Sequence, residues 1–543
     1  MDQKFFQFST PVVLGLLAVF YLGTLAVTWR IRRKKENVDA YMVSSHKVGF
    51  GISAASMTAT WVWAASFYAA ASSGYQYGLS GPIHYGLWGA LMILFIYPFG
   101  QRFRQLAPKA HTLGELMHAR HGRSSQLMLA VSNLLGSSIS LMVNFTAAGA
   151  LVSIVSPLSF VQGVVIAAAG VLAYTLWSGF RASILTDFVQ VVGMIAVTAV
   201  IIPMVLFSLG GPSELADGLS RLTAEQADPF SMTAILEQGA PFFVAVLAYA
   251  IGNQTITQRL FAVRQDRIKS TFITATVGYG AMVIGLGMLG LMALLIGMQP
   301  VDGDLNNVVP QMASGYLPGI AIALFFLLVI ASLSSTADSD LSALSAIMMT
   351  DVYGKNIAKG RPDPRKMLLL GRITMIVATA IGLVLASLSL DILEMLVFVG
   401  ALWGAIVFPV IVSCYWRRVT NRAFTSSVIC ALALFTLVRF EWVPLTGAVG
   451  VVFEFTAAVG GGVVLGLMAF AFFGRTAGLG FGLVSALVLI PLFVAFLRDY
   501  VVLLGSLTSY GVSAIVCVAV TLAYRGPQFD FALMKQRIGD FQQ

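Results

Sequence analysis

The feature that most constrains this chain is a succession of fifteen apolar runs, each long enough to cross a lipid bilayer as a helix. A spanning helix needs about 20 predominantly apolar residues. Only 10% of the 543 residues are charged, against about 25% in soluble domains, which is too little to cover a water-soluble globule. We therefore expect an all-α polytopic membrane protein. The expected spans are 11–29, 49–73, 81–101, 126–153, 159–177, 184–209, 238–257, 271–298, 315–349, 367–388, 392–415, 423–438, 451–473, 477–497 and 501–523.

The distribution of basic residues predicts the orientation of these spans. Lys and Arg in short loops stay on the cytoplasmic side. With the N-terminus outside, only four of the 33 Lys and Arg residues fall in outer loops, which leaves 29 inside. We expect an N-out, C-in topology, with the basic loops facing lipid headgroups rather than nucleic acid. The four outer residues are Lys4, Arg221, Arg439 and Arg498.

Three aspartates lie where a charge is costly. Asp187 belongs to the first turn of the expected sixth span, and Asp338 and Asp340 lie inside the ninth. An ionisable group at membrane depth marks a candidate functional site. Asp338 and Asp340 are two residues apart and must face different sides of a helix, so only one of them can serve any one site.

The ninth span also carries a stripe of hydroxyl groups. Ser332, Ser335, Thr336 and Ser339 recur at i, i+3, i+4 and i+7, which places them on one face of a helix. A single hydroxyl in an apolar helix usually bonds back to its own backbone. A continuous stripe of hard oxygen atoms suits Na⁺ better than a transition metal. We interpret the stripe as part of a cation site.

A cation site in a chain without an ATPase domain indicates secondary transport of a solute. We expect no enzyme, because no constellation of His with carboxylates near one leaflet is apparent. An alternative from another class is a transporter-like membrane sensor. That function would require a separate signalling protein, because the tail 525–543 is short; otherwise we infer no obligate protein partner.

Several motifs together resemble the solute:sodium symporter family. They occur in the family's order over about residues 10–425, and a further pair, 58–66 and 75–82, resembles the urea permease-like branch and its bacterial relatives. This resemblance implies a bacterial inner (plasma) membrane protein. The family motifs are Thr112–Glu115 with Arg120–Gly122, Ser178–Gln190, Asn253–Arg259, Ser335–Thr336 before Asp351–Tyr353, and Tyr415–Arg418 with Arg422 and Ala423.

The resemblance implies the leucine-transporter (LeuT) architecture, in which two inverted five-helix repeats surround broken helices near the midplane. Gly252 and Asn253 are suitable residues for a break in the seventh span, whereas the second has no Gly or Pro near 58–63. The implied organisation is an extra N-terminal helix with a basic loop at 1–45, repeats at 46–210 and 211–416, four additional helices at 417–524 and a tail at 525–543.

The resemblance also implies positions for the coupling ion. The principal Na⁺ site would use the backbone carbonyls of Ala59, Val62 and Ser332 and the hydroxyls of Ser335 and Thr336. A second site found in some members would use Asp187 with positions 338 and 339.

Position 338 of this chain departs from the family pattern, because those members have a hydroxyl residue there. Two neighbouring carboxylates repel each other, which raises the pKa of one of them. Asp338, beside Ser339, is therefore a second cation ligand or a carrier of a coupling proton, so both Na⁺ and H⁺ are candidate coupling ions.

The favoured solute is small and polar, with urea or a urea-like amide first. Trp61 and Trp63 would form flat walls if the second span is unwound, and Ser66 and Gln254 would supply polar contacts. A monocarboxylate or an amino acid is the alternative. No Lys or Arg is expected in the middle of a span except Arg372 near an interface, which argues against an anionic solute. His111, His118 and His121 are expected in a solvated loop.

Overall fold

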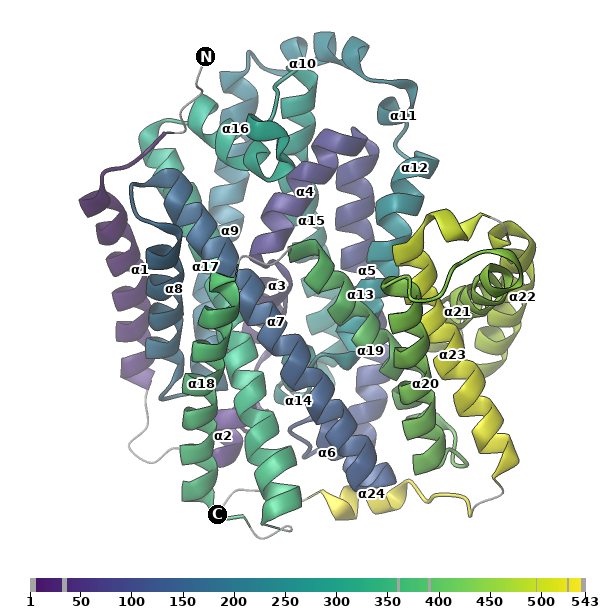
Figure 1. The fold of residues 1–543 in the computed structure, drawn as a ribbon. Helices are drawn as coiled ribbons and strands as arrows, with labels where there is room; N and C mark the ends of the chain where they lie inside the picture. The colour runs from purple at the N-terminus through teal and green to yellow at the C-terminus, as the bar shows by residue number, and fades with distance from the viewer. Residues whose placement is uncertain are drawn as a thin grey trace.

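The computed structural model describes residues 6–31, 37–358, 362–388, 392–494, 496–524 and 527–538, and these residues are almost entirely helical (Figure 1). Twelve helices in this part of the chain are long and apolar enough to cross a membrane. Three further predicted spans correspond to α8 (Phe160–Thr175), to α19 (Ile392–Tyr415) and to a broken helix. The protein is an integral membrane protein, and the count of fifteen spans stays a prediction.

The long helices follow the predicted runs to within a few residues at most ends, because length and apolarity are read directly from the chain. They are α1 (Thr10–Ile31), α5 (Ser80–Leu106), α7 (Arg123–Val155), α9 (Phe180–Ser208), α15 (Ile268–Leu295), α17 (Gly319–Ile347), α18 (Pro364–Ser387), α20 (Asn421–Arg439), α21 (Gly447–Phe473), α22 (Arg475–Phe493) and α23 (Val501–Ala523).

Two predicted spans are broken near their middle. The second consists of α3 (Phe50–Trp61) and α4 (Ala64–Tyr77), separated by Val62 and Trp63, whose ψ angles of 76° and 172° are not helical. The seventh consists of α13 (Ala240–Gly252) and α14 (Gln254–Ala262). Asn253 separates them, and its side chain accepts a hydrogen bond from the Thr255 amide at 2.6 Å. Each break leaves backbone groups without helical partners.

The connecting segments gather at two opposite ends of the bundle. α10 (Pro212–Gly218), α11 (Ala224–Ala227), α12 (Met232–Ala234) and α16 (Val308–Tyr316) lie at the upper end in Figure 1. α2 (Val38–Val43), α6 (Leu113–His121) and α24 (Ala532–Arg537) lie at the lower end. This separation matches the predicted alternation of loops, and the assignment of the lower end to the cytoplasm stays a prediction.

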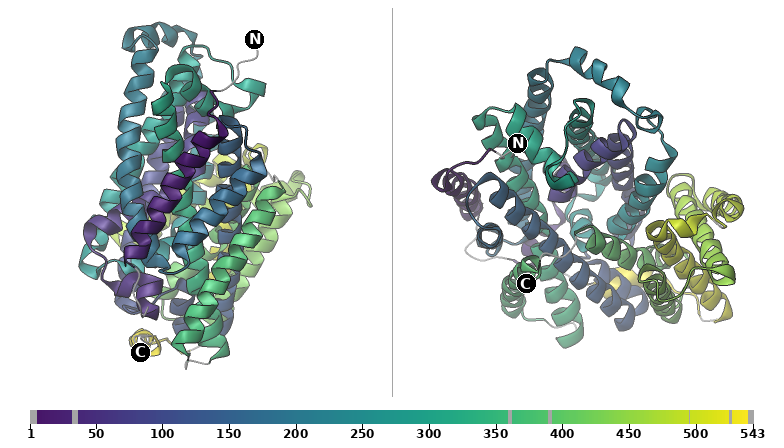
Figure 2. Two further views of the ribbon diagram at one scale, coloured as in Figure 1. Left: turned by 90° about the vertical axis from the view of Figure 1, so that its left-hand side faces the viewer. Right: turned by 45° about the horizontal axis from the view of Figure 1, so that its top comes forward.

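α17 is the central element of the bundle. Every residue from Leu328 to Ile347 is buried, and the helix packs against α3, α7, α9 and α18. The C-terminal helices α20 to α23 form a group at one side (Figure 2). The predicted functional residues, 59–339, precede this group in the chain.

Candidate functional site

The hydroxyl stripe of α17 faces the break between α3 and α4. Ser332 donates a hydrogen bond to the carbonyl of Val62. Thr336 donates to the carbonyls of Thr60, at 3.4 Å, and Ser332, at 3.5 Å. These residues are at most 1% exposed. The structure thus brings side-chain hydroxyls and unwound backbone carbonyls together in the interior.

The other two residues of the predicted principal sodium site, Ala59 and Ser335, lie nearby but make no hydrogen bond across the α3–α4 break in the described structure. Ala59 is fully buried in the last turn of α3. Ser335 donates to the carboxylate of Asp187 at 2.5 Å. The predicted Na⁺ ligands consequently adjoin the predicted second site, and Ser335 connects the two.

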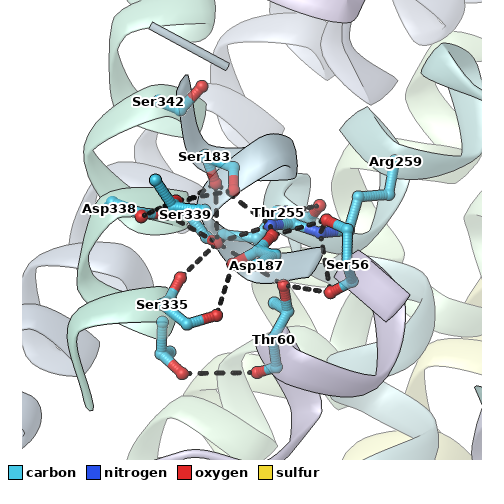
Figure 3. Close-up of polar contacts among 12 residues, drawn as sticks. Ser56, Thr60, Ser183, Asp187, Thr255, Arg259, Ser335, Asp338, Ser339 and Ser342 are labelled. Atoms are coloured by element: carbon cyan, nitrogen blue, oxygen red, sulfur yellow. Dashed lines mark hydrogen bonds and ion pairs between the residues drawn. The ribbon is translucent and has the colours of Figure 1, made fainter. Parts of the chain in front are cut away.

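Asp187 lies in a dense polar cluster (Figure 3). Its carboxylate accepts hydrogen bonds from Ser56 at 2.5 Å, from Ser335 at 2.5 Å and from Arg259 at 2.8 Å. The carboxylate is 0% exposed and the Arg259 side chain 3% exposed. Asp187 is therefore paired with an internal cation.

The expectation of no basic side chain inside the bundle is wrong for Arg259. The charge pattern assigned this residue to an inner loop, because it is the first of several basic residues after the seventh span. Beyond the break at Asn253, α14 is buried along its whole length, and the guanidinium of Arg259 also donates to Ser339 at 2.6 Å and Ser56 at 2.9 Å. One sequence signal was available: Arg259 follows a stretch of Asn, Gln and Thr residues at the end of an otherwise apolar expected span.

Asp338 belongs to the same cluster but faces α8 and α9. It accepts hydrogen bonds from Tyr174 at 2.7 Å, Ser183 at 2.5 Å and Thr186 at 3.3 Å. Ser183 also lies 3.3 Å from the guanidinium of Arg259. Asp187 thus pairs directly with Arg259, whereas Asp338 is connected to the guanidinium through hydroxyl groups such as that of Ser183.

The two tryptophans of the predicted solute site lie around Tyr249 of α13. The ring of Trp61 is 5.2 Å from that of Tyr249 and the ring of Trp63 is 6.3 Å from it. Ser66 is buried in the first turn of α4, 3.4 Å from the carbonyl of Trp61. The break in α3–α4 therefore presents Trp61 and Trp63 to one aromatic neighbour.

Gln254, the fourth predicted solute residue, uses its amide elsewhere. The amide nitrogen donates to the carbonyl of His111 at 2.9 Å, and the amide oxygen accepts from the backbone of Leu113 at 3.0 Å. These contacts connect the broken seventh span to the start of α6. The structure gives Gln254 a positioning role in the loop before that helix.

His111 is not in a solvated loop, as the sequence had indicated. It is 0% exposed and lies between Asp39, at 2.8 Å, and Glu115, at 3.1 Å. Burial lowers the pKa of His111, but hydrogen bonds to and charges on Asp39 and Glu115 outweigh burial and raise the pKa to about 9. At neutral pH the imidazolium joins α2 to α6.

A pH-dependent stability follows from His111. Because its folded pKa lies above the ordinary value of about 6.5, the stabilisation is complete below pH 6.5 and is lost as the pH rises to about 9. We expect the wild type to melt at a higher temperature than His111→Gln. This difference in melting temperature should be largest at pH 6 and smallest at pH 9.5. Melting curves of the detergent-solubilised proteins check this, with the partly exposed His118→Gln as control. A pH-independent difference would contradict it.

Residues 41–430 match the sodium:solute symporter family. The chain belongs to this family. Its members are membrane transporters that couple a cation to a solute, so the protein is a cation-coupled symporter and not an enzyme. The family prediction made from the motifs is confirmed.

Two relatives illustrate the range of solutes. "Probable urea active transporter 1" of Schizosaccharomyces pombe is 25% identical over 455 residues, covering 78% of this chain and 68% of the relative. The "Sodium/pantothenate symporter" of Escherichia coli is 25% identical over 442 residues, covering 79% and 89%. The solved structure of a Na⁺-coupled sialic acid symporter matches 89% of this chain with a TM-score of 0.68 at 18% identity and 97% coverage of that chain. The fold is therefore shared with that symporter.

Proposed function

We propose that this protein imports a small polar solute together with Na⁺ by alternating access across a bacterial inner membrane. The observation that carries the proposal is the contact of the α17 hydroxyls with the carbonyls at the α3–α4 break, through Ser332 to Val62 and Thr336 to Thr60. Hydroxyl and carbonyl oxygens are ligands of hard cations. The donors come from two separate elements, so ion binding would favour the arrangement in which α3–α4 rests on α17.

The energy of one ion is sufficient for accumulation. One charge that crosses a potential of 100 mV releases about 2.3 kcal/mol. Since about 1.4 kcal/mol corresponds to a factor of ten, one Na⁺ supports a solute gradient of roughly 40-fold from the potential alone.

The second ion site is proposed with a changed set of partners. Arg259 already pairs with Asp187 at 2.8 Å, which supplies the positive charge that a second Na⁺ would bring to this carboxylate. A further positive charge is then expected at Asp338 and Ser339, because the partners of the Asp338 carboxylate among the described residues are all hydroxyl groups, from Tyr174, Ser183, Thr186 and Ser339 itself. Either Na⁺ or a coupling proton meets this requirement.

Urea or a urea-like amide is the favoured solute. Trp61 and Trp63 provide flat aromatic surfaces at the break, and Ser66 adds a hydroxyl. The likeness to a urea transporter supports this choice. A monocarboxylate or amino acid is the second candidate, supported by the equal identity to a pantothenate symporter. A membrane sensor has no comparable support.

The experiment that tests the function is uptake into proteoliposomes with imposed gradients. Labelled urea is offered under a Na⁺ gradient and, separately, an H⁺ gradient, with acetate, pyruvate and proline as competitors. We expect Na⁺-driven accumulation of urea that collapses when the gradient is dissipated. Accumulation of no solute under either gradient would refute the proposed function.

The principal Na⁺ site gives a direct prediction. We expect Ser335→Ala combined with Thr336→Ala to raise the Na⁺ concentration for half-maximal uptake at least tenfold, because two hydroxyl oxygens are lost from the ion's surroundings. Ser345→Ala, a buried serine on the same helix that contacts Met349 instead, is the matched control. An unchanged Na⁺ dependence in the double variant would remove this site from the mechanism.

A further inference from the structure

Asp340 is a buried carboxylate for which the ion site provides no role. It lies on α17, is 0% exposed, and neither of its oxygens has a hydrogen-bond partner among the described residues. Burying an unpaired carboxylate is strongly unfavourable. Asp338 faces α8 and α9, whereas Asp340 faces α7, as their spacing predicts. Asp340 therefore belongs to a separate polar site.

Unused hydroxyl groups surround this carboxylate. Ser137 and Ser140 of α7 lie beside it, and neither hydroxyl is engaged elsewhere in the described part of the chain. Tyr249 of α13 is within electrostatic reach of Asp340, and its hydroxyl adjoins those of Ser140 and Thr255. Thr255, at the start of α14, has a buried and unpartnered hydroxyl as well. Polar oxygen atoms of α17, α7 and α14 thus gather around Asp340 and the Tyr249 hydroxyl of α13.

Tyr249 lies between the polar side chains around Asp340 and two tryptophan rings. Its ring lies 5.2 Å from that of Trp61 and 4.9 Å from that of Trp403. Trp403 is held closely between two glycines: a Cβ at Gly136 would lie 2.3 Å from its ring and one at Gly252 2.7 Å from its side chain. The indole nitrogens of Trp61 and Trp403 have no partner among the described residues. Flat rings and acceptor oxygens consequently meet at both broken helices.

We propose that Asp340, Ser137 and Ser140 form the part of the solute site that accepts N–H groups, and that they select a small planar solute rich in N–H donors. This inference rests on the proposed transport function and specifies its substrate class. Urea carries four N–H donors and one carbonyl, which hydroxyl groups can satisfy by donating. A carboxylate solute would be repelled by Asp340. The guanidinium described in the polar cluster around Asp187, that of Arg259, is already bonded to Asp187, Ser56 and Ser339.

Uptake kinetics of three variants test the proposal. Asp340→Asn keeps the volume but replaces an acceptor oxygen by a donor, and we expect it to raise the KM for urea at least tenfold while the Na⁺ concentration for half-maximal uptake changes less than twofold. Ser140→Ala should raise the KM about three- to fivefold. Ser132→Ala, a buried serine on α7 that is likewise unpartnered in the described structure, is the control and should leave it unchanged. An unchanged KM in Asp340→Asn, or a shift in Na⁺ dependence instead, would overturn the assignment; the latter would make Asp340 an ion ligand.

A competitor panel separates this inference from the proposed function. Acetamide and guanidinium should inhibit urea uptake in the wild type, whereas pyruvate and proline should not. If the wild type takes up a carboxylate solute with Na⁺ and Asp340→Asn takes it up equally well, the transport function is supported and the inference about Asp340 is overturned. If the wild type transports nothing, the function fails, and binding of labelled urea to the solubilised protein still decides the inference: binding lost in Asp340→Asn supports it, and no binding by the wild type refutes it.

Discussion

Arg259→Gln is expected to abolish ion-coupled uptake and to lower the stability of the protein severely. The substitution leaves Asp187 buried at 0% exposure without a cationic partner. Removing one member of a buried ion pair costs about 3–5 kcal/mol, a large part of the stability of a typical fold. Melting temperature in detergent and solute uptake in proteoliposomes measure the two effects.

Two further variants distinguish charge balance from general damage. Arg259→Gln combined with Asp187→Asn should recover much of the melting temperature, because no unpaired buried charge remains. The double variant should not recover transport, because the polar cluster around position 187 is altered. Arg264→Gln, which breaks an exposed pair with Asp266, should change neither, since surface ion pairs contribute about 1 kcal/mol or less. A single Arg259→Gln variant with normal melting and uptake would show that this ion pair is dispensable.

Gly290→Ala is expected to have the second large effect, through packing. Gly290 lies on α15 against α4, and a Cβ there would lie 1.7 Å from the carbonyl oxygen of Ala71. The contact is reciprocal, because a Cβ at Gly74 of α4 would lie 2.1 Å from the carbonyl of Gly287. The two backbones must separate, and overpacking of this kind costs about 1–3 kcal/mol or more.

The displaced helix carries the α3–α4 break, so Gly290→Ala should also weaken Na⁺ binding. Gly193→Ala on α9 is the matched control, because a Cβ there has no atom within 4 Å. That variant should leave the melting temperature unchanged or raise it slightly, since Ala favours a helix over Gly by about 1 kcal/mol. Equal melting temperatures for the two variants would contradict the close approach of α4 and α15.

The helix faces used by the proposed ion site were predictable from local patterns. The spacing of Ser332, Ser335 and Thr336 placed them on one helix face, and the two-residue separation of Asp338 and Asp340 placed these aspartates on different faces. Both statements depend only on helix geometry. The structure adds the partners of each face, such as the Val62 carbonyl for Ser332.

The misplaced residues share one cause. Arg259 was assigned to a loop and His111 to solvent because sequence patterns relate a residue to its neighbours along the chain and not to its depth in the fold. All of α14, which begins after the break at Asn253, is buried, and Arg259 is buried with it. His111 is buried by α2 and α6, whose carboxylates, Asp39 and Glu115, stabilise its charge.

The sequence alone determined that this protein is a helical membrane transporter, because apolar length, charge alternation and family motifs are properties of contiguous residues. Only the tertiary structure decided which buried charges meet. Asp187 has Arg259 as its partner, Asp338 has hydroxyls from α8 and α9, and Asp340 faces α7. These pairings depend on how helices that are distant in the sequence cross one another. In a low-dielectric interior, a shift of a few ångströms in a partner's position decides whether a buried charge is compensated.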